Sequence, residues 1–161
     1  MIPINVSQQI KEPVGSMRSY DIDEEIDIES TANRIQGQVT LIRTNRSILV
    51  KGRLQADAEI SCSRCLNMFH HPLEFYIEEE YFPITDDASL PKPDEPSCFI
   101  INERHLLDLT EAVQQYALLA IPMKPLCRRD CAGLCPHCGC NRNEGLCYCI
   151  PQQAYNSPSD L

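Results

Sequence analysis

The stretch CRRDCAGLCPHCGCNRNEGLCYC, residues 127–149, contains seven of the ten cysteines of this 161-residue chain. Within it, Cys135 and Cys138 are spaced as in a zinc knuckle, in which two thiolates grip one ion and the glycine that follows permits a tight turn. Cys147 and Cys149 return after eight intervening residues and can complete a tetrahedron of four sulfurs. The stretch therefore predicts a structural zinc site made by these four cysteines.

Among the remaining cysteines of the stretch, the pair Cys127 and Cys131 still needs partners. The only other closely spaced pair in the sequence is Cys62 and Cys65. We therefore expect a second zinc ion to join these four thiols and to tie the tail to the body of the protein. The expected content is about two zinc ions per chain.

Other arrangements of the same thiols remain open. Cys140 lies close to Cys138 in the sequence and could compete with it as a ligand. Ten is an even number, so a disulfide framework is an alternative, although paired cysteines without a secretion signal point to metal. A tail-only cluster would give a different pairing, with the sets Cys127, Cys131, Cys135, Cys138 and Cys62, Cys65, Cys147, Cys149.

The composition indicates a folded and strongly acidic protein. Hydrophobic residues make up 43 %, and 23 acidic residues against 14 Lys and Arg give a formal charge of −9. Two four-thiolate zinc sites would lower this charge to about −13. Such a chain repels a phosphate backbone as a whole and suits a basic partner, such as a ribosomal protein. The first ten residues do not resemble a secretory signal, and no apolar run is long enough to span a membrane, so we expect a cytoplasmic location.

The cysteine-rich tail is locally basic, because four cations there face only Asp130 and Glu144. These cations either balance the charge of the thiolates or contact RNA or a protein partner, and the sequence leaves both interpretations open. They are Lys124, Arg128, Arg129 and Arg142.

Ahead of the tail, apolar and polar residues alternate in four segments, as they do in strands with one buried face. These segments are 17–29, 35–43, 47–60 and 69–81, with shorter strands expected within 1–16 and at 99–101. The inward positions of the second and third segments are expected to be Val39, Leu41, Leu49, Leu54, Ala56, Ala58 and Ile60. The pattern predicts an α+β, mainly β fold, with a curled antiparallel sheet or a small partly open barrel.

One main helix is predicted over about 109–121, where apolar residues recur every three or four positions. Asp108 or Thr110 can cap it and Pro122 ends it. Three further residues are expected to broaden its apolar surface: Leu118, Leu119 and Ile121. We expect the helix to pack across the open face of the sheet. The expected organisation is a β body over 1–126, a zinc-binding tail over 127–149 and a disordered end over 150–161.

Several short motifs follow one another between residues 62 and 149. They are CSRCL at 62–66, Phe69, His71-Pro72, EEEYF at 78–82, LDLTEAV at 107–113, LLAIPMKPLC at 118–127 and CAGLCPHCG at 131–139. With these motifs the chain resembles the YceD family, the large ribosomal RNA subunit accumulation proteins. The resemblance implies a cytoplasmic-type protein of bacteria or plastids that supports the build-up of large-subunit ribosomal RNA, with no settled catalytic chemistry. The chain departs from the family at Cys140, where the resemblance implies a small residue.

The motifs argue against an enzyme. Four sulfur ligands per ion leave no open coordination position, and the sequence has no Ser/His/Asp set, glycine-rich phosphate loop or HExxH helix. We expect a non-catalytic, zinc-binding assembly factor that contacts a ribosomal protein or a large-subunit assembly intermediate. The alternatives are a redox-switched chaperone with Cys140 as its resolving thiol, and a zinc-dependent RNA-processing hydrolase.

Overall fold

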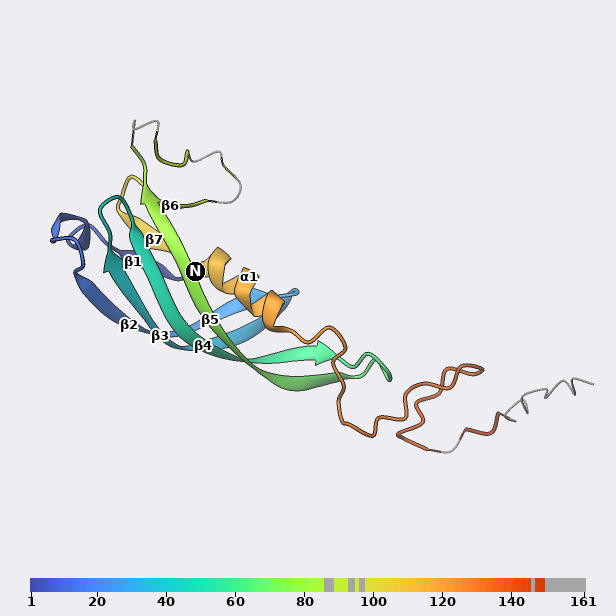
Figure 1. The fold of residues 1–161 in the computed structure, drawn as a ribbon. Helices are drawn as coiled ribbons and strands as arrows, with labels where there is room; N and C mark the ends of the chain where they lie inside the picture. Colours follow the sequence, from blue (N-terminus) through green and yellow to red (C-terminus); the bar gives the residue numbers. More distant parts are fainter. Residues whose placement is uncertain (86–88, 93–94, 96–97, 146, 150–161) are drawn as a thin grey trace, which may run out of the picture. The chain divides into compact units, whose positions relative to one another are not determined.

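The computed structural model describes residues 1–85, 89–92, 95, 98–145 and 147–149 (Figure 1). The chain divides into two compact units. Unit 1 comprises Met1–Ile60 and His70–Met123, and unit 2 comprises Ser61–Phe69 and Lys124–Leu161. The end predicted to be disordered, 150–161, lies outside the described residues. Unit 2 therefore gathers one short segment from the middle of the chain with the cysteine-rich tail.

Unit 1 is organised around a five-stranded sheet in the order β2-β3-β4-β5-β6. The pairs β2–β3 and β3–β4 are antiparallel, whereas β6 runs parallel to β5. A separate antiparallel pair is formed by β1 and β7. The elements are β1 (Pro3–Asn5), η1 (Gln9–Lys11), β2 (Met17–Ile28), β3 (Thr31–Arg43), β4 (Ile48–Ser61), β5 (Met68–Pro83), β6 (Phe99–Ile101), β7 (Leu106–Asp108) and α1 (Thr110–Ala120).

Strict alternation decides which face of β4 is buried. From Ile48 onward, every second residue of this strand faces the core, and Leu54 and Ile60 are buried as predicted. The prediction for Leu49 is wrong, because it has the opposite parity; Ile48 and Val50 on either side of it are buried instead. A shift of one residue is enough to move a strand side chain to the other face.

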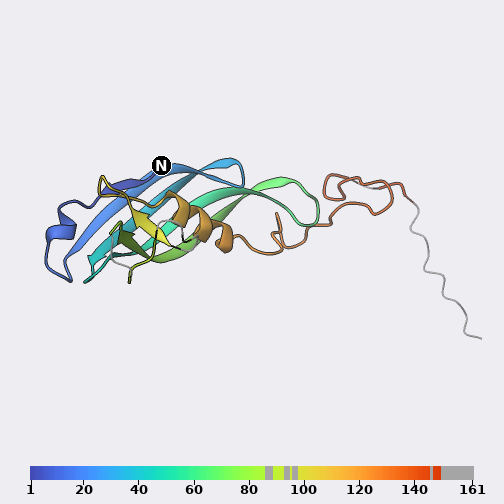
Figure 2. The same ribbon diagram turned by 90° about the horizontal axis from the view of Figure 1, so that it is seen from above.

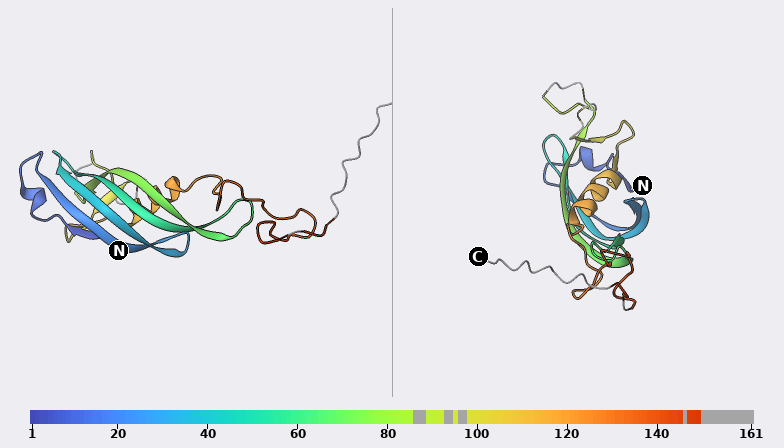
Figure 3. Two further views of the ribbon diagram at one scale, coloured as in Figure 1. Left: turned by 90° about the horizontal axis from the view of Figure 1, so that it is seen from below. Right: turned by 90° about the vertical axis from the view of Figure 1, so that its right-hand side faces the viewer.

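The helix α1 lies along the concave face of the curled sheet (Figures 2 and 3). It contacts strands on both sides. The side-chain amide of Gln114 donates to the carbonyl of Asp27 on β2 at 3.0 Å, and the hydroxyl of Tyr116 donates to the carbonyl of Glu78 on β5 at 3.1 Å. The predicted position of the helix on the open face is therefore confirmed.

The helix begins and ends within one residue of the predicted bounds. Leu109 occupies the N-cap position without a capping side chain, while the carboxylate of Asp108 accepts a hydrogen bond from the backbone N–H of Thr110 at 2.9 Å. The prediction that Leu118 and Leu119 widen the buried face is wrong. Both are exposed, Leu119 by 82 %, since the helix buries mainly small residues against the sheet.

The predicted fold class is confirmed: the chain is mainly β, with one main helix and a C-terminal cysteine cluster. The sheet is open, with β2 and β6 at its two edges, and does not close into a barrel. The long connection between β5 and β6 permits their parallel pairing, which a short hairpin could not. In the described part of the chain, no helix is long and apolar enough to cross a membrane.

We expect the substitution Leu54→Ala to lower the free energy of unfolding of unit 1 by about 2–5 kcal/mol. Leu54 is fully buried on the central strand β4, and its truncation leaves a cavity as well as losing apolar burial. Leu119→Ala is the matched control and should change the free energy by less than about 0.5 kcal/mol. Urea unfolding followed by far-UV circular dichroism measures both, and equal effects would contradict the assignment of the core.

Candidate metal centre

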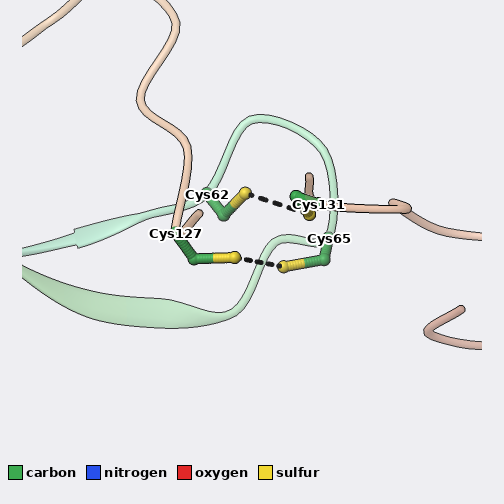
Figure 4. Close-up of side chains that lie close together, drawn as sticks. All are labelled: Cys62, Cys65, Cys127 and Cys131. Carbon is green, nitrogen blue, oxygen red and sulfur yellow. Dashed lines mark hydrogen bonds between the residues drawn. The ribbon is translucent and has the colours of Figure 1, made fainter. Parts of the chain in front are cut away.

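Four thiols from two distant segments of the chain meet in unit 2 (Figure 4). The sulfurs of Cys62 and Cys131 lie 3.8 Å apart, those of Cys65 and Cys127 lie 3.7 Å apart, and all four are within 4.8 Å of one another. A regular tetrahedron with zinc–sulfur bonds of about 2.3 Å has sulfur–sulfur edges of about 3.8 Å. This first set therefore has the dimensions of a four-thiolate metal site.

The second set consists of Cys135, Cys138, Cys147 and Cys149, whose sulfurs also lie within 4.8 Å of one another. The sulfur of Cys147 is 3.3 Å from that of Cys135 and 3.5 Å from that of Cys138. Three members of the first set are buried, whereas Cys138 of the second set is exposed. All ten cysteines are among the described residues, and none forms a disulfide.

Residues 62–67 and 135–140 form the same turn. In each, the backbone N–H of the first cysteine donates to the carbonyl of the sixth residue, at 2.9 Å and 2.8 Å respectively. The N–H of the fifth residue donates to the carbonyl of the first cysteine, at 3.0 Å and 2.9 Å. The N–H of the third residue faces the sulfur of the first cysteine, at 3.5 Å and 3.4 Å. One repeated backbone turn thus positions a pair of cysteines in each set.

The fifth position of this turn requires left-handed backbone. Gly139 has φ +74°, which glycine adopts without steric cost, and the expected tight turn behind Cys138 is present. The equivalent residue of the other turn is Leu66, with φ +61°. A leucine in this region is sterically disfavoured by about 1–2 kcal/mol, so the surrounding contacts must hold it there.

Cys140 is the sixth residue of its turn and occupies the place that Asn67 has in the other. At this position the turn uses backbone groups: the carbonyl accepts from the N–H of Cys135, and the N–H of Cys140 is the first cause that lowers the pKa of Cys138. The sulfurs of Cys138 and Cys147 raise the pKa of the Cys140 thiol to about 12, which indicates that the three sulfurs are close. Cys140 nevertheless stands outside the set of four mutually close sulfurs.

Backbone N–H groups stabilise the thiolate of the first cysteine in each turn. The N–H groups of Cys138 and His137 lower the pKa of Cys135 to about 5. The N–H of Cys65 is the largest cause that lowers the pKa of Cys62 to about 6. Since a metal binds the thiolate, these two residues are already in the form that the ion requires at neutral pH.

Two further side chains support the first set, and the sequence pattern reveals neither. The guanidinium of Arg64 donates to the carbonyl of Cys131 at 3.1 Å. The side-chain amide of Asn143 donates to the sulfur of Cys131 at 3.3 Å, and this is the first cause that lowers the pKa of that thiol. Twelve residues separate the two, so no local spacing signals the contact.

The four cations predicted as contact residues, Lys124, Arg128, Arg129 and Arg142, are all exposed in unit 2. Arg128 has a local role, because its guanidinium donates to Oδ1 of Asn143 at 2.6 Å and lies 3.5 Å from the carboxylate of Asp130. The side chains of the other three form no hydrogen bond or ion pair with any residue that the structure describes. These three cations are therefore available to an external partner.

The repeated turn predicts which cysteine can be replaced without loss of an ion. Cys140→Asn, which copies Asn67, should leave about two zinc ions per chain, because only the backbone of residue 140 is used. Cys138→Asn should leave about one, since it removes a member of the second set. Elemental analysis of protein purified without chelator measures the content. Loss of an ion from the first variant would show that Cys140 is a ligand.

The shifted thiol pKa values predict the number of protons released on metal binding at pH 7.5. Burial raises the pKa of Cys127 to about 12, and the sulfur of Cys147 is the first cause that raises the pKa of Cys149 to about 12. These thiols are protonated at pH 7.5 and must release protons, whereas Cys62 and Cys135, with lowered pKa values, are ionised and release none. Calorimetry in buffers of different ionisation enthalpy should give fewer than about four protons per ion. A full four would mean that the thiols are not held in these environments before the ion binds.

Comparison with known proteins identifies the family to which the chain is related. Residues 50–159 match the profile of the large ribosomal RNA subunit accumulation protein YceD. A Haemophilus influenzae protein of that name is 29% identical over 138 residues, covering 81% of this chain and 74% of the relative. Uncharacterised proteins of Mycobacterium tuberculosis and Mycobacterium bovis are 30% identical over 96 residues, which cover 59% of this chain but only 45% of theirs. No solved structure matches significantly. Because the profile covers more than half of its length, the chain belongs to the YceD family.

Proposed function

We propose that this chain is a non-catalytic, zinc-binding factor that supports large-subunit ribosomal RNA accumulation and ribosome assembly in the cytoplasm. The observation that carries the proposal is the family match, together with the relative named for large ribosomal RNA subunit accumulation. The partner is a ribosomal protein or an assembly intermediate of the large subunit.

The two four-thiol sets support a structural role for the metal. Sulfur ligands at these spacings suit zinc, and the ion supplies a fixed tetrahedral cross-link. Four thiolates saturate the ion and leave no position for a substrate or an activated water, which disfavours a hydrolase. The ion in the first set would cross-link residues 61–69 with the tail, and the ion in the second set would fold the tail itself.

The distribution of charge supports contacts with both protein and RNA. Unit 2 carries five Lys and Arg against three acidic residues, a formal charge of +2 before metal is counted. Unit 1 carries the remaining nine cations and twenty acidic residues, a formal charge of −11. Two four-thiolate zinc sites would bring unit 2 to about −2, so a phosphate contact there depends on its exposed cations rather than on its net charge, whereas a basic protein is favoured at unit 1. A ribosomal assembly intermediate contains both RNA phosphates and basic proteins.

A redox-switched chaperone is the second candidate, and the position of Cys140 favours it. This fifth thiol lies beside Cys138 and Cys147 of the second set. Oxidation of two thiols to a disulfide by a peroxide would remove a metal ligand and loosen the tail. A chaperone of this kind would be needed during oxidative stress, whereas an assembly factor is needed during ordinary growth.

We expect depletion of the chain from growing cells to lower large-subunit ribosomal RNA relative to small-subunit ribosomal RNA. The wild-type chain should restore the ratio, and Arg129→Glu/Arg142→Glu should restore it poorly, because reversed charges repel phosphate. The matched control is Lys92→Glu/Arg104→Glu, which makes the same charge change at exposed positions of unit 1 and should restore the ratio. Gel analysis of total RNA measures the ratio.

The outcomes separate the candidates. An unchanged RNA ratio with new sensitivity to peroxide would support the chaperone and overturn the assembly factor. Equal failure of both charge variants would show that net charge, rather than the cations of unit 2, governs the activity. Affinity capture of the tagged chain with and without ribonuclease then tells an RNA contact from a protein contact.

A further inference from the structure

We propose that Asn143 couples the two four-thiol sets, so that an ion bound in one raises the affinity of the other for its ion. The inference rests on the metal binding proposed above. It concerns a positioning residue, because Asn143 is not itself a metal ligand in either set.

Asn143 makes one hydrogen bond to a member of the first set and two to residues next to its members. Its amide Nδ2 donates to the sulfur of Cys131 at 3.3 Å. Its Oδ1 accepts from the backbone N–H of Ala132 at 2.9 Å and from the guanidinium of Arg128 at 2.6 Å. In a fourth hydrogen bond, Nδ2 also donates to Oδ1 of Asn141 at 2.9 Å, so most but not all of the contacts of this side chain go to the segment that begins at Cys127 and ends just past Cys131.

The backbone of Asn143 belongs to the second set. It lies in the loop between Cys138 and Cys147, and its N–H donates to Oδ1 of Asn141 at 2.9 Å. Asn141 forms a bridge with Leu134, immediately before the knuckle. The loop that an ion would close between Cys138 and Cys147 is thus the loop that carries Asn143.

This arrangement gives a physical route for coupling. Without an ion in the second set, the ends of the loop are not held together, and placing Asn143 against Cys131 costs conformational entropy. An ion bound by Cys138 and Cys147 closes the loop, so the entropy has already been lost when the first set binds its ion. The donor then stabilises the Cys131 thiolate, which must carry negative charge in the loaded site.

The size of the effect follows from known outer-sphere contacts. Removing a hydrogen-bond partner of a metal ligand typically lowers metal affinity by about 10–100-fold. Coupling between two binding sites is reciprocal, so an ion in the first set must strengthen the second by the same factor. A side chain that only completed the local turn would not transmit the occupancy of one set to the other.

The experiment is a double-mutant cycle on the full chain. The zinc affinity of the first set is measured by competition with a chromophoric chelator, with the second set intact and with it disabled by Cys147→Ser/Cys149→Ser. With Asn143 present, disabling the second set should weaken the first by about 10–100-fold. With Asn143→Ala, the affinity should already be low, and disabling the second set should change it by less than about threefold.

A second variant isolates the donor. Asn143→Asp keeps an oxygen for the backbone N–H of Ala132 but loses the amide that donates to Cys131. The coupling should be lost, and the sulfur-to-metal charge-transfer band of cobalt in the first set should move to lower energy, because the thiolate is no longer stabilised. Asn67→Ala is the matched control, an exposed asparagine in the same unit, and should behave as wild type.

The possible results are distinct. Loss of coupling in both Asn143 variants, with about two ions still bound at saturation, supports the inference. Equal coupling in wild type and both variants, or two sites that bind independently in wild type, overturns it and leaves the proposed metal centre intact. A wild-type chain that binds no zinc overturns both proposals.

Discussion

The meeting of Cys62 and Cys65 with Cys127 and Cys131 is the contact on which unit 2 depends. In the unfolded chain, closing the stretch between Cys65 and Cys127 costs roughly 4 kcal/mol of loop entropy by the logarithmic relation for flexible chains. The cluster available to offset it is small: three buried cysteines with Phe69, Leu126 and Cys127 packed against them. A structural zinc ion contributes about 10–16 kcal/mol of apparent binding free energy at neutral pH, so metal binding outweighs the closure cost where apolar burial does not.

The features that could be predicted from the sequence are those that depend on short-range spacing. The strands of unit 1 follow from period-two alternation, and the four-thiol sets follow from spacing, because each pair lies on one short turn. The exposure of Leu119 could not be predicted, because the sequence shows that the residue is apolar but not that the buried residues of the helix are Ala112, Val113 and Ala117. β7 is too short for a periodic signal and exists because it pairs with β1. Asn143 acts across twelve residues through an amide that resembles any loop asparagine in the sequence.

The acidic surplus of unit 1 is not neutralised by its ion pairs. Arg34 pairs with Asp23 at 2.6 Å and Lys51 with Glu78 at 3.4 Å, but each of these side chains is at least 36 % exposed. Exposed ion pairs contribute about 0–1 kcal/mol to the free energy of unfolding, so their main effect is on the electrostatic potential at the surface rather than on stability. On the edge strand β2, a surplus of acids discourages pairing with the edges of other sheets and repels phosphate. The negative charge of unit 1 thus restricts which partners it can bind, but it has little effect on the fold of unit 1.

Comparison of the two turns shows which part of residue 140 the fold requires and which part only adds chemistry. Asn67 and Cys140 occupy the same place in two turns with the same backbone hydrogen bonds, and the turn uses their backbone groups. A residue whose side chain is not needed for the turn is free to vary, so the thiol at residue 140 is not explained by folding. It lies beside the sulfurs of Cys138 and Cys147 of the second set, and Cys138 is exposed to solvent. If zinc binding alone shaped this loop, a nonreactive side chain would serve as well, and Asn67 demonstrates that the turn accepts one.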